Sequence, residues 1–184
     1  MNPIQILAVD DQISSLIALD DILTGLDAKL IKATSAKEAL LIMLKKSIDC
    51  ILLDVSMPEM DGFEFLRTVR SAPAYSQIPV IMITGKIFSE NETLKAYKFG
   101  AVDFLLKPLN PETVYRKVCF IVQQARRINA VKGIEKELSG LEKNIIAPLE
   151  TLLKLSEISV QQEQVLSDIT KKLQRLHGTW QELK

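Results

Sequence analysis

Short apolar runs alternate with helix-length segments over the first two thirds of the chain. The runs are Ile4–Val9, Lys29–Ala33, Cys50–Asp54, Val80–Thr84 and Phe104–Leu106. Each has the length of a β-strand, and several are continuously apolar, as expected for parallel strands covered on both faces. Five such units in about 125 residues predict an α/β fold with an open, doubly wound parallel sheet of five strands.

The segments between these runs carry signals for the ends of helices. Two serines are each followed three residues later by a glutamate, the pattern of a capping box: Ser35 with Glu38, and Ser89 with Glu92. Gly100 stands where a helix needs a C-terminal glycine. The triplet Asn110-Pro111-Glu112 predicts an N-cap, a proline at the first helical position and an acid in the first turn.

The pattern changes near residue 125, after which strand signals are absent. The strong helix breakers there are Gly133, Gly140 and Pro148. Apolar residues form two series at helical spacing, Ile134, Leu138, Leu141, Ile145, Leu152, Leu155 and then Leu166, Ile169, Leu173, Leu176, Trp180, Leu183. The second series keeps the 3,4 spacing of a coiled-coil seam, and Ser156–Gln161 is interpreted as a turn.

These patterns predict a C-terminal all-α antiparallel helical hairpin. A single hairpin is too thin to be stable alone, so a second copy is expected to complete a dimeric four-helix bundle. The predicted organisation is an α/β domain over 1–124, a helical linker over 125–133 that continues the fifth helix, and a hairpin dimerisation domain over 134–184.

Composition narrows the class of protein. Of 184 residues, 47% are hydrophobic and 25% charged, which is typical of a globular protein. Lys plus Arg and Asp plus Glu both total 23, and this zero net charge disfavours a nucleic-acid partner. We expect neither a secretory signal nor a membrane span, and hence a cytoplasmic protein. Cys50 and Cys119 lie in apolar runs and are expected to be buried thiols of a reducing compartment.

Polar residues follow four of the predicted strands. Asp10 and Asp11 follow the first, Asp54 ends the third, Thr84 ends the fourth and Lys107 follows the fifth. Ligands bind at the carboxyl edge of such a sheet, where these groups converge. Three clustered carboxylates need a cation, and a set of oxygen ligands suits Mg²⁺.

A magnesium ion held by carboxylates usually also contacts phosphate oxygens. Asp54 is therefore a candidate nucleophile that forms an aspartyl phosphate. Lys107 can supply positive charge, and the Thr84 hydroxyl can donate a hydrogen bond to a phosphate oxygen. A phosphohydrolase of the haloacid dehalogenase type is disfavoured, because Asp10-Asp11-Gln12 lacks the Asp-x-Asp motif of that family.

Four motifs together closely resemble the receiver domains of bacterial two-component response regulators. They are Ala8-Val9-Asp10-Asp11, Leu52-Leu53-Asp54-Val55-Ser56-Met57-Pro58-Glu59-Met60-Asp61-Gly62, Ile83-Thr84-Gly85 and Gly100-Ala101-Val102-Asp103-Phe104-Leu105-Leu106-Lys107-Pro108. The resemblance covers residues 3–124 and implies a flavodoxin-like fold. Two positions depart from the family pattern: Gly85 replaces the usual alanine, and Phe104 lacks a tyrosine hydroxyl.

The resemblance also implies roles for individual residues. Asp54 would accept a phosphoryl group from the phosphohistidine of a histidine kinase or phosphotransfer protein. Mg²⁺ would be bound by Asp10, Asp11, Asp54 and the backbone carbonyl of Ser56. Lys107 would contact the phosphate. Thr84 and Phe104 would form a switch pair, in which movement of Thr84 lets the Phe104 ring turn inward.

A second resemblance concerns the helical region. Leu141-Glu142-Lys143-Asn144-Ile145-Ile146-Ala147-Pro148-Leu149 resembles the phosphoacceptor helix of histidine kinase dimerisation domains, with Lys143 at the position of the histidine. Lysine cannot act as a phosphohistidine, so this position is degenerate. A generic dimerising hairpin explains the same residues equally well, and both interpretations predict a homodimer.

The leading hypothesis is a response regulator that signals to a protein target through its dimeric helical region, without DNA-binding or enzymatic output beyond its own dephosphorylation. Two alternatives remain open. One is a phosphotransfer protein that uses His177, the single histidine. The other is a structural scaffold with a vestigial receiver.

Overall fold

The structure, a computed structural model, describes residues 3–85, 94, 96–149, 151, 164–165, 167–172 and 175. The chain divides into two compact units, Met1–Arg127 and Ile128–Lys184. Each unit is described by itself below.

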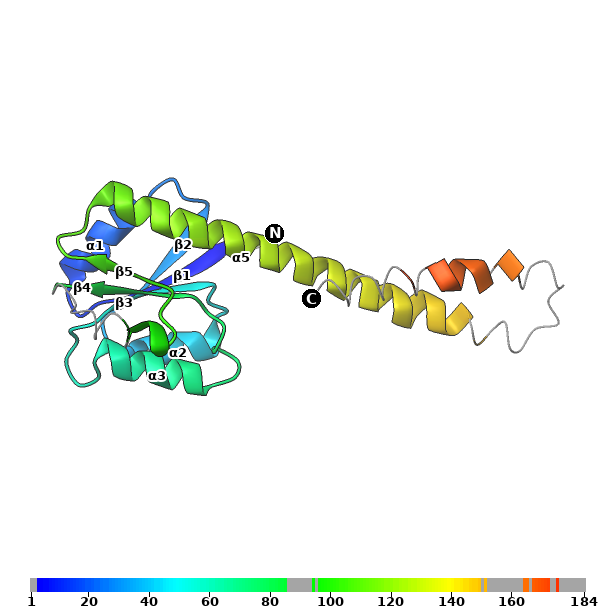
Figure 1. The fold of residues 1–184 in the computed structure, drawn as a ribbon, viewed down its shortest axis with the longest axis horizontal. Helices are drawn as coiled ribbons and strands as arrows, with labels where there is room; N and C mark the ends of the chain where they lie inside the picture. Colours follow the sequence, from blue (N-terminus) through cyan, green and yellow to red (C-terminus); the bar gives the residue numbers. More distant parts are fainter. Residues whose placement is uncertain are drawn as a thin grey trace. The chain divides into compact units, whose positions relative to one another are not determined.

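The first unit is built on a five-stranded parallel sheet (Figure 1). Its strands are β1 (Ile4–Val9), β2 (Ala28–Ala33), β3 (Cys50–Asp54), β4 (Val80–Thr84) and β5 (Asp103–Leu106). They lie in the order β2-β1-β3-β4-β5, and every neighbouring pair is parallel. The predicted strands are confirmed, with β2 and β5 each starting one residue earlier than expected.

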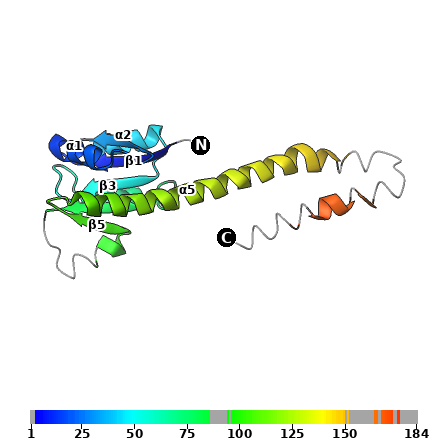
Figure 2. The same cartoon turned by 90° about the horizontal axis from the view of Figure 1, so that it is seen from above.

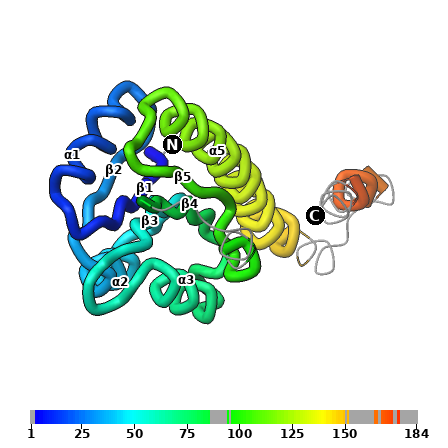
Figure 3. Tube along the Cα trace, turned by 60° about the vertical axis from the view of Figure 1, so that its left-hand side comes forward, coloured from blue at the N-terminus to red at the C-terminus, as the bar shows by residue number. Residues whose placement is uncertain are grey.

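Helices cover both faces of this sheet, as Figures 1 and 3 show. They are α1 (Ile13–Ile22), α2 (Ala36–Lys45), α3 (Gly62–Ser71) and the first part of α5 (Pro111–Leu141). Residues 94 and 96–98 are also helical. One hydrophobic core joins the sheet to α2 and α3, and a second joins it to α1 and α5. All five residues of β3 and of β4 are buried, because both faces of these strands are covered.

The helix caps depart from the predictions in two places. The Ser35 hydroxyl accepts the Glu38 N–H at 3.2 Å, but the Glu38 carboxylate accepts the N–H and hydroxyl of Thr34, at 2.7 and 2.8 Å. The predicted reciprocal box is therefore wrong in one half, because Glu38 reaches one residue further back. A complete capping box begins α3 instead, where Asp61 and Glu64 accept each other's backbone N–H. The pair Ser89 and Glu92 lies outside the described residues.

Two other terminal signals are confirmed. Gly100 adopts φ +92°, the left-handed conformation that a residue without Cβ tolerates best. The Asn110 side chain accepts the Thr113 N–H at 2.9 Å and so caps α5. The Asn110 cap starts α5 directly after the loop that leaves the carboxyl end of β5.

The second unit is helical wherever it is described. The helix α5 runs unbroken through Gly133 and Gly140 to Leu141 (Figure 2), so the expectation that these glycines act as breakers is wrong. A single glycine costs a helix only about 1 kcal/mol, which neighbouring residues offset. A π-helical turn, Glu142–Ile146, follows. Such a wider turn suits the approach to Pro148, whose ring crowds the carbonyl four residues earlier.

The predicted turn at Ser156–Gln161, most of the second apolar series and His177 lie outside the described residues. Residues 164–165, 167–172 and 175 are helical. The hairpin and the four-helix bundle therefore stay predictions. Of the two free thiols, Cys50 is buried, but Cys119 is only partly buried because it lies at the edge of the α5 face that packs on the sheet.

Candidate functional site

The candidate site lies where the winding of the sheet reverses. The strands β1 and β3 are neighbours, while the chain leaves β1 for β2 on one side and β3 for β4 on the other. In open parallel sheets this switch point leaves a crevice at the carboxyl ends of the two strands. Asp10 directly follows β1, and Asp54 is the last residue of β3. The topology therefore brings these two carboxylates to the crevice.

Three carboxylates meet there. One oxygen each of Asp10, Asp11 and Asp54 lies within 4.8 Å of the other two. Asp10 is 0% exposed and Asp54 is 3% exposed, whereas Asp11 is open to solvent. Backbone amides orient the two buried groups: Gln12 N–H donates to Asp10 Oδ1 at 2.9 Å, and Ser56 N–H donates to Asp54 Oδ2 at 2.7 Å. The structure thus brings together the predicted acidic residues.

Lys107 joins the two buried carboxylates. Its Nζ lies 2.8 Å from Asp10 Oδ2 and 2.6 Å from Asp54 Oδ1. Burial by itself lowers the pKa of Lys107, but the hydrogen bonds and charges of Asp10 and Asp54 outweigh this effect and hold the pKa above its ordinary value. The Lys107 N–H also donates to the Thr84 carbonyl at 2.8 Å, and the Lys107-Pro108 peptide is cis. Lys107 is therefore held in place both by its backbone N–H and by its side-chain ammonium.

The donor set fits a magnesium ion. Among the residues that the structure describes, three carboxylates face the Lys107 ammonium, so the cluster keeps an excess of negative charge that a divalent cation balances. All of the side-chain donors are oxygens, the ligands that Mg²⁺ prefers. Asp10, Asp11 and Asp54 are the residues that would hold it.

Gly62 supports the site through a close approach that sequence reasoning did not assign. A Cβ at this position would lie 2.5 Å from the backbone carbonyl oxygen of Asp54, so only glycine fits. The Gly62 N–H also donates to the Val55 carbonyl at 3.0 Å. The sequence motif after β3 contains Gly62, but the short distance that requires a glycine there depends on how α3 folds back on β3. Gly85 differs, because nothing lies within 4 Å of a Cβ there.

The predicted switch pair lies on two adjacent strands. Thr84 is 2% exposed and pairs in register with Leu106, while Phe104 pairs with Met82. The Phe104 ring is partly buried and lies 6.2 Å from the ring of Tyr97. Lys143 is an exposed residue of the π-helical turn in the second unit.

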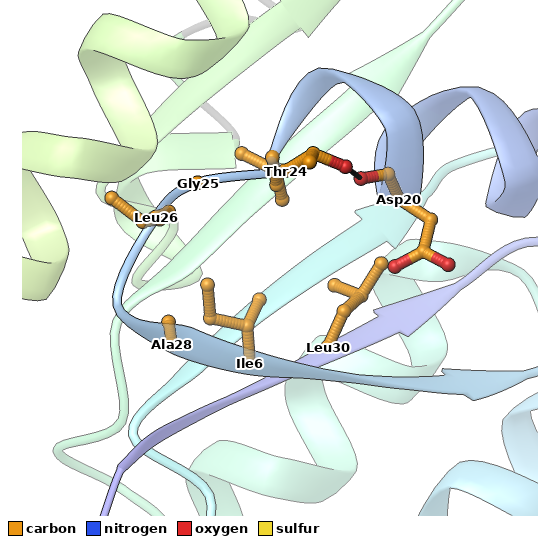
Figure 4. Close-up of a pocket in the computed structure, with 8 residues that line it drawn as sticks. Ile6, Asp20, Thr24, Gly25, Leu26, Ala28 and Leu30 are labelled. Carbon is orange, nitrogen blue, oxygen red and sulfur yellow. Dashed lines mark hydrogen bonds between the residues drawn. The ribbon is translucent and has the colours of Figure 1, made fainter.

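A cavity of about 140 Å³ lies elsewhere in the first unit (Figure 4). It is lined by Ile6, Asp20, Leu23, Thr24, Gly25, Leu26, Ala28 and Leu30. Most of the wall surface is polar, and the carboxylate of Asp20 already pairs with Lys32 at 2.7 Å. None of the acidic-site residues lines this cavity, so it is separate from the candidate site.

The comparisons with curated proteins find relatives in bacterial signalling. The chain is 39% identical to a probable cyclic di-GMP phosphodiesterase of Vibrio cholerae over 94 residues, which is 51% of this chain and 21% of that protein. It is 28% identical over 177 residues to the cyclic di-GMP phosphodiesterase response regulator RpfG of Xanthomonas campestris, covering 95% of this chain and 44% of that protein. The chain thus spans less than half the length of these relatives.

The names of these relatives contradict the expectation that the protein lacks enzymatic output. Both are named as cyclic di-GMP phosphodiesterases, although the similarity covers mainly the receiver. A receiver fold does not determine the output that it controls, because function resides in specific sites rather than in the fold.

None of the helices in the described ranges is long and apolar enough to cross a membrane.

Solved structures agree with the fold. The chemotaxis protein CheY4 of Vibrio cholerae is 33% identical, with a TM-score of 0.61 over 65% of this chain and 99% of that one. A putative response regulator from Chloroflexus aurantiacus is 29% identical, with a TM-score of 0.61 over 66% and 99%. The family model described as response regulator receiver domain matches residues 6–119. The chain therefore belongs to the receiver domain family of response regulators.

Proposed function

We propose that the protein is a response regulator in which Asp54 accepts a phosphoryl group from the phosphohistidine of a histidine kinase or phosphotransfer protein. The observation that carries this proposal is the contact of Lys107 Nζ with Asp54 Oδ1, at 2.6 Å, inside a cluster of three carboxylates. In the reaction an Asp54 oxygen attacks phosphorus, a P–O bond forms, and the P–N bond to the donor histidine breaks. The leaving imidazole takes up a proton.

Residues of this chain prepare that reaction mainly through position and charge. The Lys107 ammonium offsets negative charge on Asp54 and can move to a phosphoryl oxygen. The Ser56 N–H already donates to Asp54 Oδ2 at 2.7 Å and keeps the carboxylate aligned. Mg²⁺, held by Asp10, Asp11, Asp54 and the Ser56 carbonyl, supplies charge neutralisation when it is bound.

The switch that follows is a shift between two populations. A phosphoryl group on Asp54 attracts the hydroxyl of Thr84, whose strand β4 lies next to β3. Movement of Thr84 makes room for the Phe104 ring to turn inward from β5. The surface formed by residues 94 and 96–98, β5 and the first turns of α5 is then repacked.

Labelling by acetyl phosphate tests the acceptor. With Mg²⁺ present, we expect labelling of the natural chain and its loss in Asp54→Asn. Asp61→Asn is a matched control, because Asp61 also follows β3 but caps α3, and asparagine caps a helix as well as aspartate does. Undiminished labelling of Asp54→Asn, or labelling that persists after chelation of Mg²⁺, contradicts the proposal.

We further propose that the second unit forms a homodimer, with a four-helix bundle as its architecture. The support is a heptad-spaced apolar series on α5 and the π-helical turn, in which Val131, Ile134, Leu141 and Ile145 are 40 to 48% exposed. The degenerate position Lys143 would stand on this bundle. Light scattering with and without beryllofluoride tests the dimer, and a monomer in both states contradicts it.

A second candidate function is control of cyclic di-GMP breakdown. The observation that favours it is the alignment with RpfG, which runs over 95% of this chain and so includes residues of the helical unit. The test compares cyclic di-GMP levels in cells that express the natural chain or Asp54→Asn. We expect the two levels to differ, and equal levels exclude this candidate.

A further inference from the structure

Lys117, on the second turn of α5, holds the switch residue Phe104 through several contacts. Its Nζ lies 2.8 Å from Asp103 Oδ1 and 3.0 Å from the Phe104 carbonyl oxygen. The same Nζ lies 5.6 Å from the centroid of the Phe104 ring, within the range of a cation–π contact. Asp103 Oδ1 also accepts the Phe104 N–H at 2.8 Å. One ammonium thus contacts both the backbone and the ring of Phe104.

This cluster matters because it holds Phe104 in place. The side chains of Lys117 and Asp103 are 34% and 33% exposed, so their ion pair alone adds little to stability. The pair nevertheless joins β5 to α5 at the residue whose ring is proposed to move. Tyr97 contacts the same ring from the preceding helical segment.

We propose that Lys117 is a positioning residue that sets how readily the receiver switches; this inference rests on the proposed function. In the described arrangement Lys107 and Ser56 engage the two oxygens of Asp54, which is the arrangement of the unmodified carboxylate. The Lys117 contacts stabilise this arrangement selectively. Their removal therefore raises the population of the switched form and, through linkage, tightens the binding of any phosphoryl mimic.

Beryllofluoride with Mg²⁺, titrated into the full chain and followed by ¹⁹F NMR, measures this shift. The variant Lys117→Met removes the charge but keeps an unbranched apolar stem. We expect it to tighten the apparent affinity about two- to fivefold, the range expected for losing an exposed cation–π contact. Lys117→Arg keeps a cation over the ring and is expected to restore the natural affinity.

Arg116→Met is the matched control, because Arg116 precedes Lys117 on α5 and pairs with Glu112, with both side chains more than 70% exposed. We expect it to leave the affinity unchanged. A second variant, Asp103→Asn, weakens the same ammonium contact from the strand and is expected to tighten binding as Lys117→Met does. It also keeps the proposal testable if Lys117→Met fails to fold.

The NMR resonances of the Phe104 ring, recorded without beryllofluoride, separate this inference from the proposed function. In Lys117→Met they are expected to move toward the positions seen in the beryllofluoride-saturated natural chain. Unchanged affinity together with an unchanged ring resonance, in Lys117→Met and Asp103→Asn alike, overturns the role of Lys117. If beryllofluoride binds to no variant, the proposed function is contradicted, and the ligand-free ring position still decides whether Lys117 holds Phe104.

Discussion

The two halves of α5 form one continuous helix but are stabilised in different ways. From Pro111 to Ala125 the helix buries four residues against the sheet: Val114, Val118, Val122 and Ala125. From Ile128 to Leu141 it buries none, although its apolar residues recur at heptad spacing. Apolar residues at three- and four-residue spacing occur in both halves, so burial, and not spacing, distinguishes the part of α5 that packs on the sheet from the part whose apolar residues stay exposed.

The largest expected effect comes from placing the same charge in each half. Val118 is 0% exposed and Val131 is 40% exposed. We expect Val118→Asp to cost at least about 4 kcal/mol of unfolding free energy, because a buried carboxylate has no partner there. Val131→Asp is expected to cost less than about 1 kcal/mol and to weaken dimerisation. Urea unfolding at low protein concentration measures the free energy of unfolding of both variants. Equal losses would contradict the difference in burial between the two halves of α5.

Glycine substitutions give a smaller effect, of opposite sign in the two units. Gly62→Ala is expected to destabilise by about 1–3 kcal/mol, because the new Cβ meets the Asp54 carbonyl and the backbone must shift. Gly133→Ala fills open space in a helix and is expected to stabilise it by about 0.5–1 kcal/mol. Thermal unfolding measures both changes, and stabilisation by Gly62→Ala would contradict the close approach.

The smallest test concerns the two thiols, one in the sheet and one on α5. Burial, followed by the nearby charge of Asp49, raises the pKa of Cys50 to about 12. The thiolate is the reactive form, so Cys50 is expected to resist iodoacetamide at about pH 8, while the partly buried Cys119 reacts. Peptide mass spectrometry measures the two extents of modification. Equal modification in the folded protein would contradict the burial of Cys50.

The sheet was predictable because its signals are local. Cys50–Leu53, for example, is continuously apolar, and the polar Asp54 that follows marks the end of the strand. The helix ends were harder to predict. The Glu38 carboxylate accepts the N–H of Thr34 instead of that of Ser35, and the capping box of Asp61 and Glu64 was not predicted. Competing backbone N–H donors separated by one residue differ too little in energy for a sequence pattern to distinguish them.

The candidate site was predictable in its membership but not in its geometry. The positions of the strand ends predict that Asp10, Asp54 and Lys107 converge. The structure places the Lys107 ammonium within hydrogen-bonding distance of both carboxylates. The contacts of Lys117 with Phe104 and the approach of Gly62 to Asp54 depend on how helices fold back on the sheet. Such long-range distances leave no periodic signal in the sequence.

Trapping of the acyl phosphate tests the central claim most directly. Borohydride reduces an aspartyl phosphate to homoserine, which peptide mass spectrometry can locate after treatment with acetyl phosphate and Mg²⁺. We predict homoserine at position 54 and unmodified aspartate at Asp10 and Asp11. Homoserine at either of those two residues, or at no aspartate at all, would contradict the assignment of Asp54 as the phosphoacceptor.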